Sequence, residues 1–217
     1  MITGLVKSLS ALWKRCLADV GGATAIEFAL LAAPMMTVLL GCFDLGYQAY
    51  LRSVVQGALN DVARTASLEA PALSCDGDTL VEQVQCAIKS RSDIVARDAT
   101  YEVKIKNYFD FAGIGRSEKL VTDYNKNGKY DTGDCFVDLN ENAIFDLNED
   151  GIDDDGSGRA GVGGADDVAF YEVTVRMPRL FPIHYFISAS PDYAITGETA
   201  IRNQPYARQK IPPTVCK

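Results

Sequence analysis

The most constraining feature of this sequence is an apolar run of twenty-one residues, 23–43, in which Glu27 is the only charged side chain. As an α-helix, which rises about 1.5 Å per residue, a run of this length crosses the roughly 30 Å hydrocarbon core of a bilayer. The 22 residues before it carry more basic than acidic side chains. Basic residues on that side of a span favour a cytoplasmic N-terminus. The sequence therefore predicts a single-pass membrane protein whose C-terminal part is exported.

Helical periodicity continues beyond this apolar run. No proline occurs between residues 44 and 69, and apolar side chains recur there at the spacing of one helical face. These apolar positions are Leu45, Val55, Leu59, Val62 and Ala66. Pro71 and the turn at Cys75-Asp-Gly end the pattern. We therefore expect a basic leader at residues 1–22, a transmembrane and stalk helix at 23–70 and an exported domain at 71–217.

The exported part combines helical and strand patterns. Residues 79–89 have the periodicity of a short amphipathic helix, and apolar and polar side chains alternate at 101–106 and 170–176 as in half-buried strands. A further strand is expected at about 193–202. The sequence thus predicts an α+β fold in which the long N-terminal helix packs on a small antiparallel sheet. No basic surface interleaved with aromatic residues is visible in the sequence, so nucleic-acid binding is not expected.

An acidic insert separates the first two expected strands. Residues 123–167 hold thirteen acidic and three basic side chains, so the net charge of this insert is −10. The rest of the chain carries +2, which gives the whole chain its net charge of −8. An anionic segment of this density repels nucleic acid and anionic lipid and attracts hard cations. The alternative interpretation is a solvated acidic loop without a ligand.

Oxygen-bearing side chains in the insert follow the spacing of calcium-binding loops of the EF-hand and thrombospondin type 3 kinds, which these loops resemble. The first loop has its ligand positions at Asp123, Asn125, Asn127, Lys129 (through its carbonyl), Asp131 and Asp134, with Gly128 at the turn. The second has Asp138, Asn140, Asn142, Asp146 and Glu149, and Ala143 replaces the turn glycine. A third, overlapping register has Asp146, Asn148, Asp150 and Asp154. We expect calcium as the bound cofactor and a weaker second loop.

Four of the six cysteines lie beyond the apolar run, namely Cys75, Cys86, Cys135 and Cys216. An even number of cysteines on the exported side indicates disulfides in an oxidising compartment. Four cysteines allow three pairings. We expect Cys75 to pair with Cys86 across the short helix, which leaves Cys135 for Cys216.

The residues around the start of the apolar run resemble a known family. The pattern comprises Gly22-Ala23, Glu27-Phe28, Pro34, Gly41 and Ala63-Arg64, and residues 196–206 resemble the C-terminal end of such proteins. It is similar to the TadE-like pseudopilins of the Tad (tight-adherence, Flp-type) pilus system. In that family a prepilin peptidase cuts after the glycine, so the resemblance implies a cut between Gly22 and Ala23.

Cleavage there makes Glu27 the fifth residue of the mature chain, where the resemblance implies a role in assembly. The implied partners are other pilin subunits, pilus assembly proteins, the prepilin peptidase and the membrane. The implied location is the bacterial cytoplasmic membrane with the C-terminal domain outside, and incorporation into an extracellular pilus. Phe28 replaces the tyrosine common in major Flp pilins, and the exported domain is much larger than theirs, which favours a minor pilin.

These features bear on three classes of function. The favoured one is a minor pilin that contributes to pilus assembly or surface adhesion, and the alternative is an uncleaved, membrane-anchored calcium-binding envelope protein or adhesin. An enzyme is not expected, because the only histidine, His184, lies in the apolar sequence Phe-Pro-Ile-His-Tyr-Phe and no nucleophile motif accompanies it. A mature N-terminus at Ala23 would distinguish the first two classes.

Overall fold

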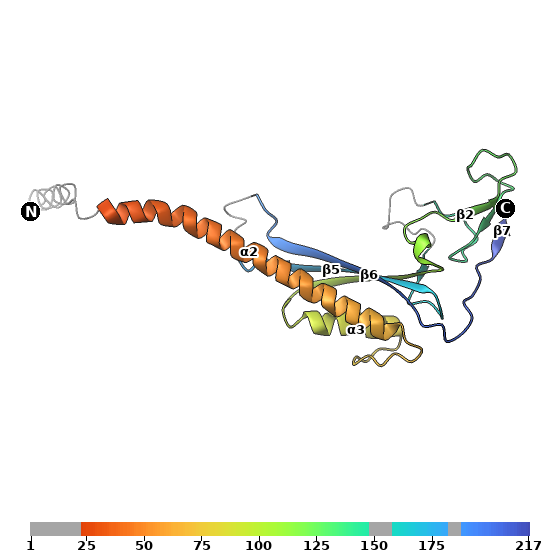
Figure 1. Cartoon of the computed structure of the whole chain (residues 1–217), viewed down its shortest axis with the longest axis horizontal. Coiled ribbons are helices and arrows are strands. Elements are labelled where there is room, and N and C mark those ends of the chain that lie inside the picture. The colour runs from red at the N-terminus through yellow and green to blue at the C-terminus, as the bar shows by residue number, and fades with distance from the viewer. Residues whose placement is uncertain (1–22, 148–157, 182–187) are drawn as a thin grey trace, which may run out of the picture. The chain divides into compact units, whose positions relative to one another are not determined.

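The computed structural model describes residues 23–147, 158–181 and 188–217 (Figure 1). The chain forms two compact units, one made of Met1–Tyr47 with Leu180–Ala189 and the other of Gln48–Arg179 with Ser190–Lys217. The helix α2, Ala23–Ala66, contributes its first part to one unit and its second part to the other.

The first part of α2 is apolar and exposed. Within the described residues, α2 is the one helix that is long and apolar enough to cross a membrane. Pro34 lies inside the helix without ending it, which is common in membrane helices because other groups can satisfy the backbone that a proline frees. The exposed apolar side chains of this part include Ile26, Phe28, Leu30, Leu31, Met35, Met36 and Val38.

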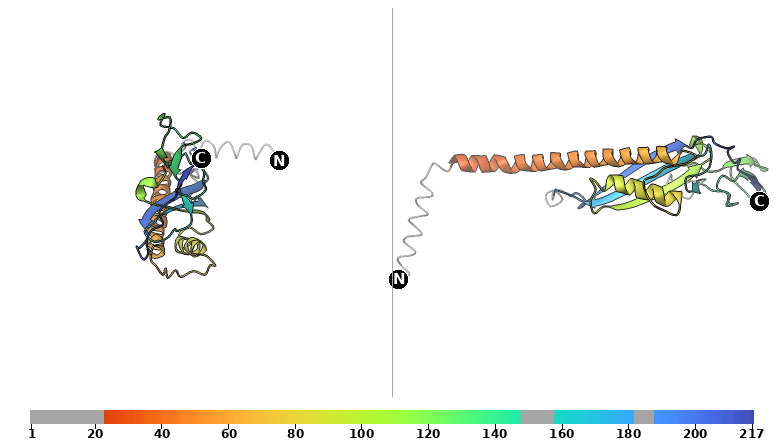
Figure 2. Two further views of the ribbon diagram at one scale, coloured as in Figure 1. Left: turned by 90° about the vertical axis from the view of Figure 1, so that its right-hand side faces the viewer. Right: turned by 90° about the horizontal axis from the view of Figure 1, so that it is seen from below.

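The second unit is built on a four-stranded antiparallel sheet with the order β4-β1-β5-β6. Its strands are β1 (Thr100–Tyr108), β4 (Arg159–Ala160), β5 (Val168–Pro178) and β6 (Asp192–Arg202). The second part of α2 runs along this sheet with the short helix α3 (Leu80–Ser92) beside it (Figure 2). This arrangement confirms the α+β prediction of a long N-terminal helix with a small antiparallel sheet.

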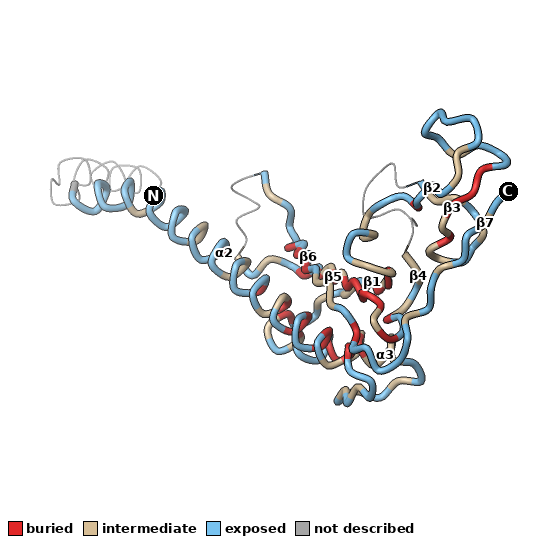
Figure 3. The backbone as a smooth tube through the Cα atoms, turned by 45° about the vertical axis from the view of Figure 1, so that its right-hand side comes forward, coloured by how far each residue is buried: buried red, intermediate tan, exposed pale blue. Residues whose placement is uncertain are grey.

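The hydrophobic core lies between these helices and the sheet, where Figure 3 shows the buried residues. Leu51, Val55, Leu59 and Val62 of α2 are fully buried, and Tyr193 and Ile195 of β6 face inward at alternate positions. Gly197 continues this alternation, and a Cβ there would lie 3.2 Å from Oε1 of Gln56 and 3.6 Å from Val55. The glycine thus allows α2 to approach the strand closely.

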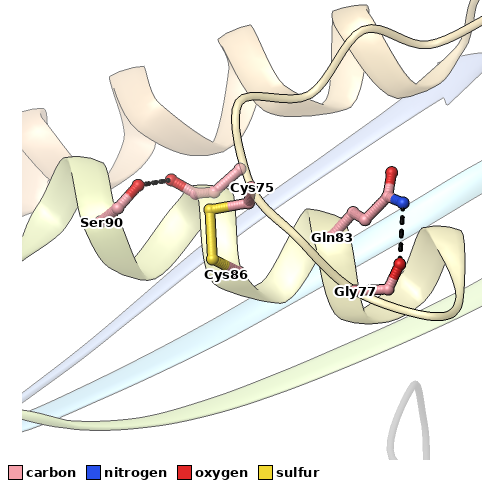
Figure 4. The surroundings of a disulfide bond; sticks show 6 residues. Cys75, Gly77, Gln83, Cys86 and Ser90 are labelled. Atoms are coloured by element: carbon pink, nitrogen blue, oxygen red, sulfur yellow. Dashed lines mark hydrogen bonds between the residues drawn. A yellow bond between two sulfur atoms is a disulfide. The ribbon is translucent and has the colours of Figure 1, made fainter.

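A capping box starts α3, in which the Thr79 hydroxyl accepts from the Glu82 N–H and the Glu82 carboxylate accepts from the Thr79 N–H. The helix buries Val84, Ala87 and Ile88 against the core. A disulfide between Cys75 and Cys86 fastens the preceding loop to this helix (Figure 4).

A second, three-stranded sheet with the order β2-β3-β7 was not predicted from the sequence. It consists of β2 (Lys119–Thr122), β3 (Cys135–Val137) and β7 (Thr214–Cys216), and a short 3₁₀ helix η2 (Phe111–Gly113) precedes it. Cys135 and Cys216 are directly opposite each other and form the second disulfide. This sheet brings the acidic insert and the C-terminal tail together.

Candidate functional site

The predicted processing segment lies at the start of α2. Gly22 is outside the described residues, and Ala23 is the first residue of the helix. Glu27 lies in the second turn of α2 and is exposed. Ala23, the residue that would become the N-terminus after cleavage, is helical.

The first acidic loop is closed by hydrogen bonds from its own backbone. The two carboxylate oxygens of Asp123 accept from the N–H groups of Lys126 (2.6 Å) and Gly128 (2.7 Å). The side-chain oxygens of Asn125 and Asn127 accept from N–H groups two residues further on, at 3.0 and 2.7 Å. Both asparagine amides donate to the Asp131 carboxylate, at 2.7 and 2.6 Å. These hydrogen bonds hold the pKa of Asp131 below its ordinary value.

Asp134 completes this loop from the last position of the template. Asp134 is only 2% exposed, and its two carboxylate oxygens accept from the N–H groups of Tyr124 (3.0 Å) and Asp131 (2.9 Å). Asp134 therefore ties the beginning of the loop to its end. Because Cys135 follows it directly, the strand β3 and its disulfide fix the position of this carboxylate.

The second loop repeats the same pattern fifteen residues later. The two Asp138 oxygens accept from the N–H groups of Asn142 (3.1 Å) and Ala143 (2.8 Å). The amides of Asn140 and Asn142 donate to Asp146, at 2.6 and 2.9 Å. Ala143 has a φ of 59°, where the equivalent Gly128 of the first loop has a φ of 76°. The turn is thus made in the second loop without glycine, in a left-handed conformation that is unfavourable for alanine.

Glu118, which the sequence analysis did not select, closes the second loop. Its carboxylate accepts from the N–H groups of Leu139 (2.6 Å) and Asp146 (3.3 Å). These two residues are equivalent to the two whose N–H groups donate to Asp134 in the first loop. Glu118 therefore makes in the second loop the hydrogen bonds that Asp134 makes in the first. Glu149, to which the sequence template assigned the closing position, lies outside the described residues together with Asn148, Asp150 and Asp154.

Burial and two neighbouring carboxylates make Glu118 unusual. Its exposure is 4%. Burial is the main cause that raises its pKa above the ordinary glutamate value, and the charges of Asp146 and Asp138 raise it further, against the hydrogen bonds from Leu139 and Asp146. Asp138 and Asp146 place negative charge close to the Glu118 carboxylate. This arrangement favours protonation of Glu118 or binding of a cation beside it.

Aromatic rings join the two loops. Tyr130 and Phe145 occupy equivalent positions in the loops and stack with their centroids 4.7 Å apart. Phe136 of β3, which is fully buried, meets both rings edge-on with centroid distances of 5.4 Å. The loops therefore form a pair that packs on β3 rather than two independent turns.

The C-terminal tail braces both loops. The Lys217 carbonyl accepts from the Gly133 N–H, and the Lys217 ammonium donates to the Ala143 carbonyl at 2.8 Å. Lys210 pairs with Glu141 at 2.5 Å and holds the pKa of that carboxyl below its ordinary value. The Cys135–Cys216 disulfide fixes the tail covalently beside these contacts.

The candidate metal ligands of both loops are oxygen atoms, which are the ligands that calcium prefers. Oxygens that accept one hydrogen bond keep a further lone pair for a cation. In the part of the chain that the structure describes, however, no three acidic, histidine or cysteine side chains gather around one point as metal ligands. Hydrogen bonds from backbone N–H groups and asparagine amides hold the carboxylate oxygens of the two loops in place.

The family comparison agrees with the resemblance seen in the sequence. Residues 22–64 match the model of the TadE-like protein family. Over these residues the chain is similar to that family. The match begins at Gly22 and ends two residues before the end of α2, so neither sheet nor the acidic insert is part of it. No curated protein and no solved structure shows a significant match to the chain.

Proposed function

We propose that this chain is a minor pilin of a Tad-type pilus, cut between Gly22 and Ala23 by a prepilin peptidase. The observation that carries the proposal is the TadE-like match over residues 22–64, which starts at the expected cleavage site. Glu27 is exposed on α2 four residues after Ala23, at the position where the resemblance expects the assembly glutamate. We propose no enzymatic activity for the chain.

Cleavage would serve assembly in two ways. It removes the basic leader, which holds the chain on the cytoplasmic side, and it creates a free amine on Ala23. A carboxylate such as Glu27 inside a membrane is costly unless it has a partner. The amine of a neighbouring subunit would neutralise it once subunits associate. The exposed apolar side chains of α2 would then contact other helices in place of lipid.

Replacing Glu27 by alanine tests this mechanism in cells that make the pilus. The variant should still be cut but should be missing from sheared pili, because the neighbouring amine loses its partner. Cys42→Ala is the matched control, since Cys42 is also exposed on α2 but is uncharged. If Glu27→Ala enters pili as well as Cys42→Ala does, Glu27 has no role in assembly.

We also propose that the two acidic loops bind calcium outside the membrane. The first site would use Asp123, Asn125, Asn127, the Lys129 carbonyl, Asp131 and Asp134. The second would use Asp138, Asn140, Asn142 and Asp146, with Glu118 at the closing position. The equivalent hydrogen bonds of Asp134 and Glu118 support this assignment. Calcium would offset the repulsion between these carboxylates and stabilise the folded form by mass action.

Calcium titration of the detergent-solubilised chain tests this second proposal. We expect added calcium to raise the melting temperature and to protect residues 123–134 from protease. The variant Asp123→Asn with Asp131→Asn should lose the protection of this segment, because amides cannot replace two carboxylates in a calcium site. The control Glu102→Ala with Asp192→Ala removes the same charge from exposed positions on the first sheet and should keep it. Equal calcium responses in both variants would overturn the proposal for the first loop.

A further inference from the structure

The connection between β5 and β6 contains an apolar segment that belongs to the same compact unit as the membrane helix. Leu180–Ala189 groups with Met1–Tyr47, whereas Arg179 and Ser190 on either side belong to the other unit. The Phe181 ring stacks on the Phe43 ring, with centroids 6.3 Å apart and planes 26° apart. Phe43 is the last residue of the apolar run.

All three side chains at this place are apolar, and two of them are open to solvent while Phe181 is half-buried. Leu180 is 56% exposed and Phe43 is 61% exposed. The chain continues after Phe181 with the sequence Pro-Ile-His-Tyr-Phe-Ile, which has no acidic, lysine or arginine residue. These six residues, which include His184, lie outside the described part of the chain, and the contact consists of Phe43, Leu180 and Phe181.

The base of this connection is fixed by Arg179. Its backbone N–H donates to the Pro191 carbonyl at 3.0 Å, and its side-chain Nε–H donates to the Ser190 carbonyl at 2.6 Å. The guanidinium also lies over the Tyr193 ring, 4.7 Å from its centroid. The two strands are therefore held together up to the residue that precedes Leu180.

If residues 23–43 span the bilayer, Phe43 lies at the boundary between hydrocarbon and headgroups. A ring stacked on Phe43 lies at nearly the same depth. Aromatic side chains are enriched at this level of membranes because one side of the ring meets acyl chains and the other meets polar groups. An exposed leucine beside it would also be removed from water there.

We propose that Leu180 and Phe181 are a second membrane contact, seated in the lipid interface on the exported side of the membrane. The contact rests on the proposed membrane span of α2 and not on pilus assembly. We assign lipid as the binding partner because Phe181 stacks on Phe43, which is the last residue of the proposed span. The contact would keep the β5–β6 connection at the membrane surface while the chain is in the bilayer.

Tryptophan quenching in vesicles tests the contact with the full chain. The sequence contains one tryptophan, Trp13, so Trp13→Phe gives a background without this fluorophore. Leu180→Trp is then made in that background and placed in phosphatidylcholine vesicles with nitroxide labels near the headgroup or near the acyl-chain end. We expect its emission to shift to the blue and to lose more intensity with the shallow label than with the deep one.

Two further single-tryptophan variants separate the possible failures. Met35→Trp lies within the apolar run and reports the span, with more quenching by the deep label. Ile211→Trp is exposed in the second unit and reports unspecific adsorption, with little quenching by either label. Quenching of Met35→Trp without quenching of Leu180→Trp overturns the contact and leaves the span intact. Absence of quenching in both overturns the span and the contact with it, and equal quenching of Ile211→Trp and Leu180→Trp shows adsorption rather than a defined contact.

Discussion

Replacing both cysteines of the Cys135–Cys216 pair by alanine tests how the acidic loops are held in place. This disulfide joins residues 81 positions apart, so its removal should lower the unfolding free energy by about 4.5 kcal/mol in the chain-entropy description. The Cys75–Cys86 disulfide joins residues 11 positions apart, and its removal should cost about 2.8 kcal/mol. The two double variants should therefore differ by roughly 1.7 kcal/mol.

Urea denaturation of the detergent-solubilised chain, followed by near-ultraviolet circular dichroism, measures this difference. The two variants should also differ in their response to calcium. Asp134, which closes the first loop, directly precedes Cys135, whereas the other disulfide lies beside α3. Only the loss of Cys135–Cys216 should weaken calcium protection of residues 123–134. Equal loss of stability in the two variants, or unchanged calcium protection without Cys135–Cys216, would refute this reasoning.

Two further predictions concern the turns of the two loops and the carboxylate of Glu118. Ala143→Gly removes an alanine from a left-handed conformation and should raise the unfolding free energy by about 1 kcal/mol. Gly128→Ala should lower the unfolding free energy by a similar amount, because a Cβ there meets no neighbouring atom and only the left-handed backbone is unfavourable. Melting temperatures of the two variants that do not shift in opposite directions would contradict this. The raised pKa of Glu118 means that the folded state binds its proton more tightly than the unfolded state. Without calcium, the contribution of Glu118 to stability should therefore be greatest below the ordinary glutamate pKa and should fall as the pH rises through the raised pKa. The stability of the wild type minus that of Glu118→Gln isolates this effect, and a difference that is constant over this pH window would disprove it.

Elements with long periodic patterns were predictable from the sequence. The helix α2 and the strands β1, β5 and β6 have enough residues for helical spacing or alternation to identify them, and each strand lies at the predicted place. The second sheet was not predicted. Its strands have three or four residues, too few for alternation to be recognised, and it pairs β3 with β7 from the other end of the chain.

The closing residue of the second loop shows the same limit. The sequence template looks for ligands within twelve consecutive residues, so it could not indicate Glu118; Glu149, which it selected, lies outside the described residues. Glu118 precedes the loop by twenty residues and reaches it because β2 pairs with β3 and because the Glu118 N–H donates to the Asp146 carbonyl at 3.0 Å. A contact made by strand pairing has no fixed spacing in the sequence. Ala143, by contrast, was visible as a departure from the template, and the structure places it at the predicted turn.

The N-terminal mass of the chain recovered from membranes tests the central claim most directly. It should be measured in cells that contain the cognate prepilin peptidase, with Gly22→Leu as the variant that should block cleavage. The minor-pilin account predicts that the wild-type chain begins at Ala23 and that Gly22→Leu begins at Met1. Wild-type chains that all begin at Met1 would contradict it and would favour an uncleaved, membrane-anchored calcium-binding protein.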